Sequence, residues 1–336
     1  MIIDRKLLTV DNILLEVNNL TKDFPLSGGF FSKPRGWLRA LDSVSFQVYR
    51  GECFGIVGES GCGKTTLGRL VLRLLDPTSG WIKFKGETIS GLSRSRMRPL
   101  RKNIQIIFQD PYSSLNPRMR VGAIITEPLR AFQTLQKTER NQAAAELLKK
   151  VGLPATDLNR YPHEFSGGQR QRIGIARALS VQPELIVADE PVSALDVSIQ
   201  AQIINLMADL KSEFNLAYIV ISHDLGVVEH MCDRIAVMYL GVIVELAPAS
   251  AFSAASCHPY TRALLSAVPA PDPKESRPPV SLEGDVPSPL NPPPGCAFHT
   301  RCRYAMDLCQ RKRPALLEVA PQHFAACWRY GDNGTN

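Results

Sequence analysis

The residues best suited to chemistry form a glycine-rich loop, Gly58-Glu59-Ser60-Gly61-Cys62-Gly63-Lys64-Thr65. Its spacing of glycines, lysine and threonine is the one that a phosphate-binding loop requires. Small residues let backbone N–H groups turn inward around an anion, while Lys64 can reach the β- and γ-phosphates of a nucleotide and Thr65 can ligate Mg²⁺. The alternative, a chance glycine loop, is expected in roughly one chain in a hundred of this length. The loop therefore predicts a nucleotide site.

The elements around this loop come in the order that such a site needs. The apolar run 53–57 precedes it and predicts a buried strand, and apolar residues at helical spacing follow it. Those residues are Leu67, Leu70, Val71, Leu74 and Leu75. The positive end of the predicted helix would face the phosphates and add its free N–H groups to the charge of Lys64.

Polar side chains stand at the ends of three further apolar runs that predict strands. Gln109 follows 104–108, Asp189 and Glu190 close 185–190, and His223 follows 217–221. Because open α/β sheets bind ligands at the carboxyl ends of their strands, we expect these groups at the same edge as Lys64. One acid can hold Mg²⁺ through water and the next can polarise an attacking water. The amide of Gln109 could contact the metal or that water, and the imidazole of His223 could contact the γ-phosphate. A lone glutamine or histidine is usually structural. The functional interpretation of Gln109 and His223 therefore depends on their predicted position at the same edge as Lys64.

Two other features have a functional and a plain interpretation. Ser166-Gly167-Gly168-Gln169 opens a predicted helix and offers hydroxyl and N–H donors to a second anion, although the same pattern describes an ordinary serine-capped helix start. Phe24 could stack on an adenine ring or pack on the small antiparallel layer predicted around 14–17 and 44–48. The glycine-rich insert within 27–40 is predicted to be a loop, and its role stays open.

Length and composition describe an ordinary globular chain. Its 336 residues suggest one large α/β domain with an appendage, and 44% apolar and 21% charged residues do not indicate disorder. A net charge of +7 would suit nucleic acid or an anionic membrane surface but decides nothing alone. The apolar run 235–244 is about half of the roughly 20 residues of a spanning helix, and the first residues lack the order of a secretory signal. We therefore expect a cytoplasmic protein.

With these motifs in this order, the chain resembles the nucleotide-binding subunits of ATP-binding cassette (ABC) transporters over residues 13–268. The phosphate loop matches at Gly58 to Thr65, with Thr66 next to it. The signature matches at Ser166 to Gln169, where Phe165 replaces the commoner leucine. Gln109 matches the glutamine loop, Asp189 and Glu190 the acidic pair, Asp196 the loop between subunits, and His223 the switch histidine. Phe24 stands where the family often has an adenine-stacking tyrosine.

The resemblance implies an α/β fold of the phosphate-loop NTPase class. It has a RecA-like parallel sheet, an antiparallel β subdomain and a helical subdomain at about 110–180. In the family two cassettes face each other head to tail, so Ser166 to Gln169 of one would serve the ATP held by the other. Thr65, Gln109 and Asp189 would hold Mg²⁺, Glu190 would be the general base, and His223 and Gln109 would sense the γ-phosphate. The segment 111–127 would dock on membrane subunits.

The composition changes after Val268. Ten of the 25 prolines fall within 269–295, which predicts a linker with little regular structure. The tail 296–330 then carries Cys296, Cys302, Cys309 and Cys327 among arginines and lysines. Four thiols in a reducing compartment suggest a metal centre. Their spacing lacks the paired Cys-x-x-Cys of structural zinc and admits an iron–sulfur cluster, with zinc and free thiols as alternatives.

This tail resembles the C-terminal extension of dipeptide and oligopeptide importer ATPases, most of all the second ATPase of the dipeptide system. The resemblance is carried by 258–264 and by 287–296, Pro-Ser-Pro-Leu-Asn-Pro-Pro-Pro-Gly-Cys. It implies a [4Fe-4S] cluster at the four cysteines. The implied partners are a sister ATPase, two membrane permeases and an extracytoplasmic binding protein, with the chain peripheral on the cytoplasmic face of the membrane. Nickel importers share much of this cassette, so a metal complex is an alternative cargo.

Chromosome-maintenance ATPases are the competing class, since they share the cassette and would suit a basic chain. They carry a long coiled coil between the glutamine loop and the signature, whereas only 110–165 intervenes here, without sustained heptads. Soluble translation factors join two cassettes in one chain, and this chain has one phosphate loop. No direct nucleic-acid partner is therefore expected.

Overall fold

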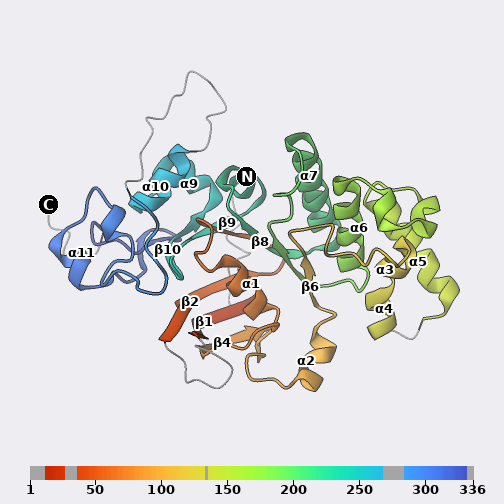
Figure 1. Ribbon diagram of the computed structural model, residues 1–336, viewed down its shortest axis with the longest axis horizontal. Coiled ribbons are helices and arrows are strands. Elements are labelled where there is room, and N and C mark those ends of the chain that lie inside the picture. The colour runs from red at the N-terminus through yellow and green to blue at the C-terminus, as the bar shows by residue number, and fades with distance from the viewer. Residues whose placement is uncertain (1–11, 27–35, 133–134, 268–283, 331–336) are drawn as a thin grey trace.

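The computed structural model describes residues 12–26, 36–132, 135–267 and 284–330. Figure 1 shows the antiparallel strands β1, β2 and β4 below a central sheet, helices α3 to α6 at one side of it, and the C-terminal segment with α11 at the other. Within those ranges, no helix combines the length and the apolar character needed to cross a membrane.

The central sheet places the predicted strand ends together. In the described part of the chain it has the strand order β11-β12-β10-β9-β3-β8-β7-β6. Its parallel strands are β3 (Cys53–Val57), β6 (Ile104–Ile107), β7 (Leu185–Asp189), β8 (Ala217–Ser222) and β9 (Arg234–Tyr239). Val57 is opposite Ser222, Ile221 is opposite Asp189, and Ala188 is opposite Ile107. The four loops that follow these residues therefore start at one edge of the sheet.

The second sheet is antiparallel and contains the predicted N-terminal strands. Its order is β2-β1-β4-β5, with β1 at Ile13–Leu26, β2 at Gly36–Tyr49, β4 at Ser79–Phe84 and β5 at Glu87–Thr88. The strands β1 and β2 are longer than predicted because they pair along their whole length, from Ile13 opposite Tyr49 to Leu26 opposite Gly36. Most of the predicted insert, 27–35, lies outside the described residues.

Helices occupy the region between β6 and β7, as the helical subdomain at about 110–180 requires. They are α3 (Val121–Ile125), α4 (Glu127–Phe132), α5 (Lys137–Lys150), η3 (Ala155–Asn159), η4 (Pro162–Glu164) and α6 (Gly167–Leu179). The predicted amphipathic helix over 139–151 is α5, which begins two residues earlier with a capping box of Gln136 and Glu139. It ends before Gly152, whose φ of +74° is a conformation that favours glycine.

The remaining elements connect or flank these layers. They are α1 (Lys64–Val71), α2 (Arg94–Leu100), α7 (Val197–Phe214), α8 (Leu225–Met231), β10 (Val242–Pro248), α9 (Ala249–Ala255), α10 (Pro259–Ser266), η5 (His299–Arg301), α11 (Asp307–Arg311), β11 (Leu317–Ala320) and β12 (His323–Ala325).

Two predicted elements extend too far. The helix after the phosphate loop ends at Val71, and Leu74 is 50% exposed. The chain turns there because Arg73 adopts a φ of +53° and its guanidinium donates to the carbonyls of Ile89 and Leu92. The strand predicted over 104–108 ends one residue early, and Phe108 is 40% exposed at the start of the next loop.

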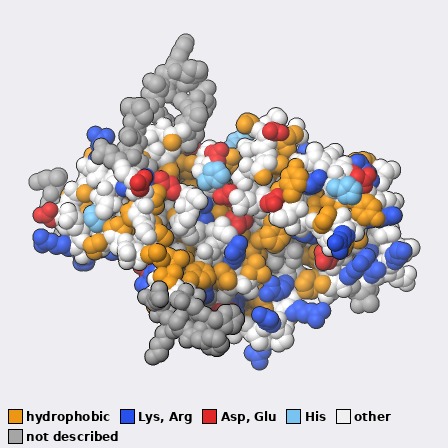
Figure 2. Space-filling view, viewed as in Figure 1, with side chains coloured by type: hydrophobic (Ala, Val, Ile, Leu, Met, Phe, Trp, Pro, Cys, Tyr) orange, Lys and Arg blue, Asp and Glu red, His pale blue; other side chains and the backbone are white. Residues whose placement is uncertain are grey.

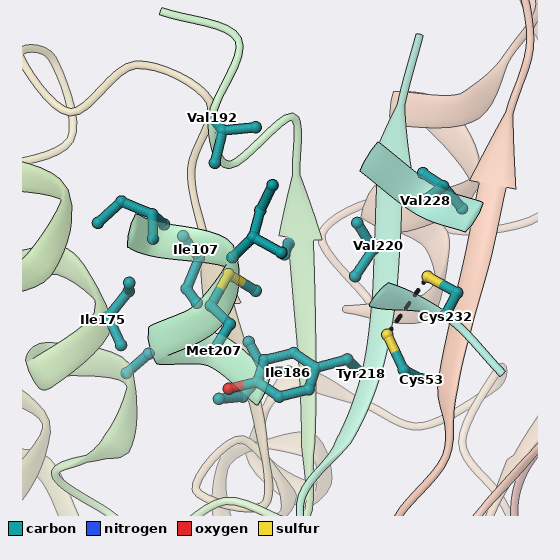
Figure 3. Packing of buried hydrophobic residues seen from close by; sticks show 14 of the residues in the cluster. Cys53, Ile107, Ile175, Ile186, Val192, Met207, Tyr218, Val220, Val228 and Cys232 are labelled. Carbon is teal, nitrogen blue, oxygen red and sulfur yellow. Dashed lines mark hydrogen bonds between the residues drawn. The ribbon is translucent and has the colours of Figure 1, made fainter. Parts of the chain in front are cut away.

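Apolar packing holds the central sheet against its helices. Figure 3 shows Ile186 of β7 and Met207 of α7 in one buried cluster, with Ile175 of α6 beside them. Each such side chain stabilises the fold by about 1.5–3 kcal/mol relative to an exposed one. In the same cluster the sulfurs of Cys53 and Cys232 lie 3.3 Å apart. Phe54 and Ile56 belong to a second buried cluster, so β3, the strand that leads into the phosphate loop, is packed on both faces.

The cysteine-rich extension is more regular than its composition predicts. Its strand β12 pairs with β10 of the cassette, with Ala325 opposite Glu245 and Phe324 opposite Leu246, and β11 pairs with β12. Phe298 is 2% exposed and joins the main core. The described part of the proline-rich segment, 284–295, has neither helix nor strand, as expected, and 268–283 lies outside the described residues.

Candidate functional site

The glycine-rich loop closes around the ammonium group of Lys64. This group donates hydrogen bonds to the carbonyls of Gly58 at 2.7 Å and Glu59 at 2.9 Å. Gly63 caps α1 with a φ of +104°, and a Cβ on it would lie 2.5 Å from the carbonyl oxygen of Ala40. Only glycine fits this turn, which leaves the first N–H groups of α1 beside the lysine charge. This is the local geometry of an anion site.

A hydroxyl and a carboxylate meet beside the start of α1. Thr65 Oγ1 donates to Asp189 Oδ1 at 3.2 Å, which joins the phosphate loop to the end of β7. Burial raises the pKa of Asp189, and the Thr65 hydroxyl partly offsets that effect. Hydroxyl and carboxylate oxygens are ligands that Mg²⁺ accepts, and a cation here would stabilise the ionised form of the buried acid.

Glu190 lies at the centre of the predicted catalytic group. Its backbone has a φ of +46°, a left-handed conformation that turns the chain at the end of β7. Gln109 Nε2 donates to Glu190 Oε2 at 2.7 Å, and His223 Nδ1 lies 3.3 Å from Glu190 Oε1. Three residues predicted from separate strand ends are therefore in direct contact.

Most of these groups border one cavity of about 340 Å³, while Asp189 and His223 contact its lining residues Thr65 and Glu190. The predicted site residues that line it are Phe24, Ser60, Gly61, Gly63, Lys64, Thr65, Thr66, Gln109 and Glu190. The ring of Phe24 at this wall leaves room for the adenine role that we predict, and it also lies under the ammonium of Lys22 at 5.0 Å. Because the cavity joins an anion cradle, two oxygen ligands and an aromatic wall, its residues fit a magnesium nucleotide.

Other predicted residues lie beside the cavity or away from it. The carboxylate of Glu59 binds Arg301 of the extension, and the thiol of Cys62 is buried under the loop. Ser166, Gly167, Gly168 and Gln169 lie at the start of α6 and do not line this cavity. The single chain therefore presents the two predicted anion sites separately.

The start of α6 has the ordinary cap that we weighed as the plain interpretation. Ser166 Oγ accepts from the N–H of Gln169 at 3.4 Å, and the Gln169 side chain accepts from the N–H of Ser166 at 3.0 Å. Ser166 is nevertheless exposed, whereas Gly168 is buried so tightly that a Cβ would lie 2.5 Å from Ile199. A capped helix start can still accept an external anion through its remaining N–H groups.

Several residues at the cavity carry no signal that sequence reasoning could have used. They are Leu38, Arg39, Ala40, Leu240, Gly241 and Pro289. Pro289 belongs to the proline-rich segment after the cassette, and its neighbours in sequence have no nucleotide motif. Only the fold brings them to the phosphate loop, because they belong to segments far from it in sequence.

The four cysteines of the extension lie near one another. Cys296 donates its N–H to the carbonyl of Cys309 at 2.8 Å. Burial raises the pKa of the Cys296 thiol to about 11, and Cys309, Cys327 and Cys302 add to that rise as neighbouring thiols. Among the described residues, however, these thiols do not form a group of ligand atoms within 4.8 Å of one another. A tetrahedral zinc at about 2.3 Å would need sulfurs roughly 3.8 Å apart.

Glu245, Cys257 and His323 do place metal-type ligand atoms within 4.8 Å of one another. The buried carboxylate already accepts from His323 Nε2 at 2.7 Å, from the N–H of Cys257 at 2.7 Å and from the N–H of His258 at 2.8 Å. Burial acts to raise the pKa of Glu245, but the hydrogen bonds from His323, Cys257 and His258 outweigh burial and lower this pKa overall. The group is a hydrogen-bonded link between β10 and β12 rather than an open ligand set.

His258, at this link, makes stability depend on pH. Burial lowers its pKa from 6.5 to about 4, against the attraction of Glu245. Between these two pKa values His258 is protonated in the unfolded chain and neutral in the folded chain. The free energy of unfolding therefore falls as pH falls from about 6.5 towards 4. We expect His258→Asn, which keeps a capping oxygen for α10, to remove about 2 kcal/mol of the loss between pH 7 and pH 5. Urea unfolding at both pH values, with the exposed His163→Asn as control, measures it. An unchanged pH slope would contradict this role.

Comparisons with known proteins agree with this geometry. Residues 41–193 match the family model described as "ABC transporter", and residues 244–309 match "Oligopeptide/dipeptide transporter, C-terminal region". The "Probable peptide ABC transporter ATP-binding protein y4tS" of Sinorhizobium fredii is 54% identical over 318 residues, which cover 95% of this chain and 90% of that protein. The "Oligopeptide transport ATP-binding protein AppF" of Bacillus subtilis is 54% identical over 320 residues, 94% of this chain and 97% of AppF.

A solved structure is similar over the cassette. The dimeric post-hydrolysis state of the ATP-binding cassette MJ0796, bound to ADP and Pi, has a TM-score of 0.62 and 27% sequence identity. The match covers 70% of this chain and 99% of that one. On the strength of the nucleotide cavity, the strand order and this similarity along nearly the whole length of its relatives, the chain belongs to the ATP-binding subunits of ABC transporters.

Proposed function

We propose that this chain binds and hydrolyses ATP to drive peptide import through membrane permeases. The observation that carries the proposal is the cavity where the phosphate loop faces Gln109 and Glu190. The names of the relatives y4tS and AppF, and the matched C-terminal region, supply the peptide cargo. The alternative cargo, nickel or another metal complex, rests on a cassette that such importers share.

Each residue at the cavity has a separate task. Lys64 and the N–H groups of the loop bind the phosphates, and Phe24 stacks on the base. Thr65, Asp189 and Gln109 would hold Mg²⁺, which when bound neutralises charge on the β- and γ-phosphates. Glu190 takes the proton of the attacking water, since its carboxylate is held by Gln109 and His223 at 2.7 and 3.3 Å. Gln109 and His223 also contact the γ-phosphate, so their positions depend on whether it is bound.

A sister ATPase supplies the other half of the site. Ser166 to Gln169 lie outside this chain's own cavity and form the start of α6, where Ser166 is exposed. The N–H groups there could bind a nucleotide held by a facing subunit. MJ0796 is described as a dimer, which supports such a pair. ATP closes the two subunits, and hydrolysis reopens them. Each chain is thereby half of two catalytic sites.

The pair docks on two permeases at the cytoplasmic face of the membrane, and an extracytoplasmic binding protein delivers the peptide. The docking surface is the segment 111–127 after the glutamine loop, where Tyr112 is 57% exposed. In the view of Figure 2, Lys and Arg side chains are spread over the extension, the middle of the molecule and the helical region, rather than gathered in one groove. That spread favours a membrane-protein partner over nucleic acid.

Copurification of the complex followed by an ATPase assay tests the proposal. Peptide together with the binding protein should raise ATP hydrolysis by the membrane complex, and Lys64→Ala should abolish it. Stimulation by nickel complexes and not by peptides would support the alternative cargo. Hydrolysis that depends on DNA or RNA would reject the transport function.

A [4Fe-4S] cluster at Cys296, Cys302, Cys309 and Cys327 is a further part of the proposal. The four thiols are neighbours, and their spacing is wider than tetrahedral zinc needs. We expect anaerobically purified protein to be brown with visible absorption, and Cys309→Ser to bleach it. Cys257→Ser, outside the group, is the control. A colourless protein containing one equivalent of zinc would reverse the assignment.

A further inference from the structure

Arg301 joins the cysteine-rich extension directly to the phosphate loop. It is the last residue of η5, immediately before Cys302, and its guanidinium contacts the Glu59 carboxylate at 2.8 Å and 3.3 Å through two nitrogens. The Arg301 side chain is 6% exposed, whereas that of Glu59 is 25% exposed. A bidentate pair of this kind fixes the orientation of both partners as well as their distance.

The same loop residue is held at two more points. The N–H of Glu59 donates to the hydroxyl of Tyr260 at 2.8 Å, and the carbonyl of Glu59 accepts from Lys64 Nζ at 2.9 Å. Glu59 therefore connects the extension to the lysine that we assign to the phosphates. The ion pair with Arg301 and the contact to Lys64 are therefore made by the same loop residue.

The support behind these contacts is an aromatic cluster. Tyr260 lies edge-on to Tyr239 with ring centroids 4.8 Å apart, and Phe298 of the extension lies 5.3 Å from Tyr239 and 5.4 Å from Tyr260. All three rings are at most 2% exposed. Phe298 is three residues before Arg301, so the packing of its ring holds η5 next to the phosphate loop.

The proline-rich segment that leads into the extension also reaches the cavity, where Pro289 forms part of the wall. The chain after the cassette thus touches the nucleotide site at two separate places, once at the wall through Pro289 and once at the loop through Arg301. An ion pair shielded from water adds little net stability over apolar packing, so the position of this pair at the loop favours a role in orienting Glu59 over a purely stabilising one.

We infer that the extension positions the phosphate loop for nucleotide, with Arg301 as the positioning residue that holds Glu59 and, through it, Lys64. The inference rests on the proposed function, since it assumes that this loop binds ATP. It gives the cysteine-rich region a task in nucleotide affinity within its own subunit. Neither the family models nor the names of the relatives assign one.

The test is the affinity of the full chain for Mg-ATP, measured by equilibrium titration. Arg301→Met should weaken binding by roughly 10- to 100-fold, by analogy with the loss seen when residues that orient metal ligands are removed. Arg303→Met, an exposed arginine two residues away, should leave it unchanged. Because the two groups act together, Arg301→Met with Glu59→Gln should bind no more weakly than the weaker single variant.

The melting temperature without nucleotide separates positioning from stability. If Arg301→Met melts earlier but binds Mg-ATP within twofold of the unaltered chain, the pair is only a structural link and the inference is wrong. Should that variant fail to fold, Arg301→Lys, which keeps the charge without the bidentate geometry, must show an intermediate loss, and unaltered affinity would overturn the inference. If the unaltered chain itself does not bind Mg-ATP, the proposed function fails first.

Discussion

Glu190→Gln is expected to lower ATP turnover by about 10²- to 10⁴-fold while leaving Mg-ATP affinity within a few fold. The substitution keeps the shape of the side chain and an amide oxygen that can accept from Gln109, but it removes the carboxylate that accepts the proton of water. Because hydrolysis reopens the pair, the variant should accumulate as a closed complex with its sister ATPase. Phosphate release and size-exclusion chromatography in Mg-ATP measure the two effects.

Glu87→Gln, an exposed carboxylate in β5, is the matched control and should turn over at the normal rate. Hydrolysis by Glu190→Gln near the normal rate would show that another group accepts the proton. Loss of ATP affinity in that variant would instead mean that Glu190 holds the nucleotide or its metal, and the division of tasks at this edge would have to be redrawn.

Ser166→Asp is expected to abolish ATP-driven association of the pair without harming the chain that carries it. Aspartate caps a helix as well as serine does, and its charge favours the positive end of α6, so the fold is retained. The same charge would face the γ-phosphate held by the sister subunit, and like charges in contact cost several kcal/mol. Association in Mg-ATP should therefore weaken by at least about 100-fold.

The neutral variant Ser166→Asn keeps the cap and serves as the control, with a much smaller expected loss. Mg-ATP affinity of the isolated chain should be unaltered in both variants, because Ser166 does not line its cavity. Equal association of Ser166→Asp and the unaltered chain would mean that the start of α6 faces no phosphate. The capping interaction would then be its whole role.

Motifs with local chemistry could be predicted from the sequence. The phosphate loop needs no distant partner to be recognised, since its glycines, Lys64 and Thr65 are consecutive. Gln109, Glu190 and His223 could be placed at one edge because buried parallel strands align their carboxyl ends, and their contacts confirm that argument. Boundaries were less predictable, as at Leu74, where the guanidinium of Arg73 stabilises a turn that apolar periodicity does not reveal.

Contacts between distant segments could not be predicted. Arg301 and Glu59 are 242 residues apart, and no periodicity links them. The pairing of β12 with β10 could not be predicted either. The strand His323–Ala325 has three residues and is too short to show alternation. Composition marked the tail as a separate irregular segment, yet its aromatic and charged side chains are fixed by the cassette beneath it.

In the proposed complex the working catalytic centre is shared between two subunits. The most direct measurement is the distance from Ser166 of each subunit to the nearest γ-phosphate, in a structure of the Glu190→Gln complex with its sister ATPase and Mg-ATP. We predict a hydrogen bond of about 3 Å to the nucleotide bound by the facing subunit's phosphate loop. A subunit that encloses its own triphosphate, with 166–169 far from any nucleotide, would contradict the account.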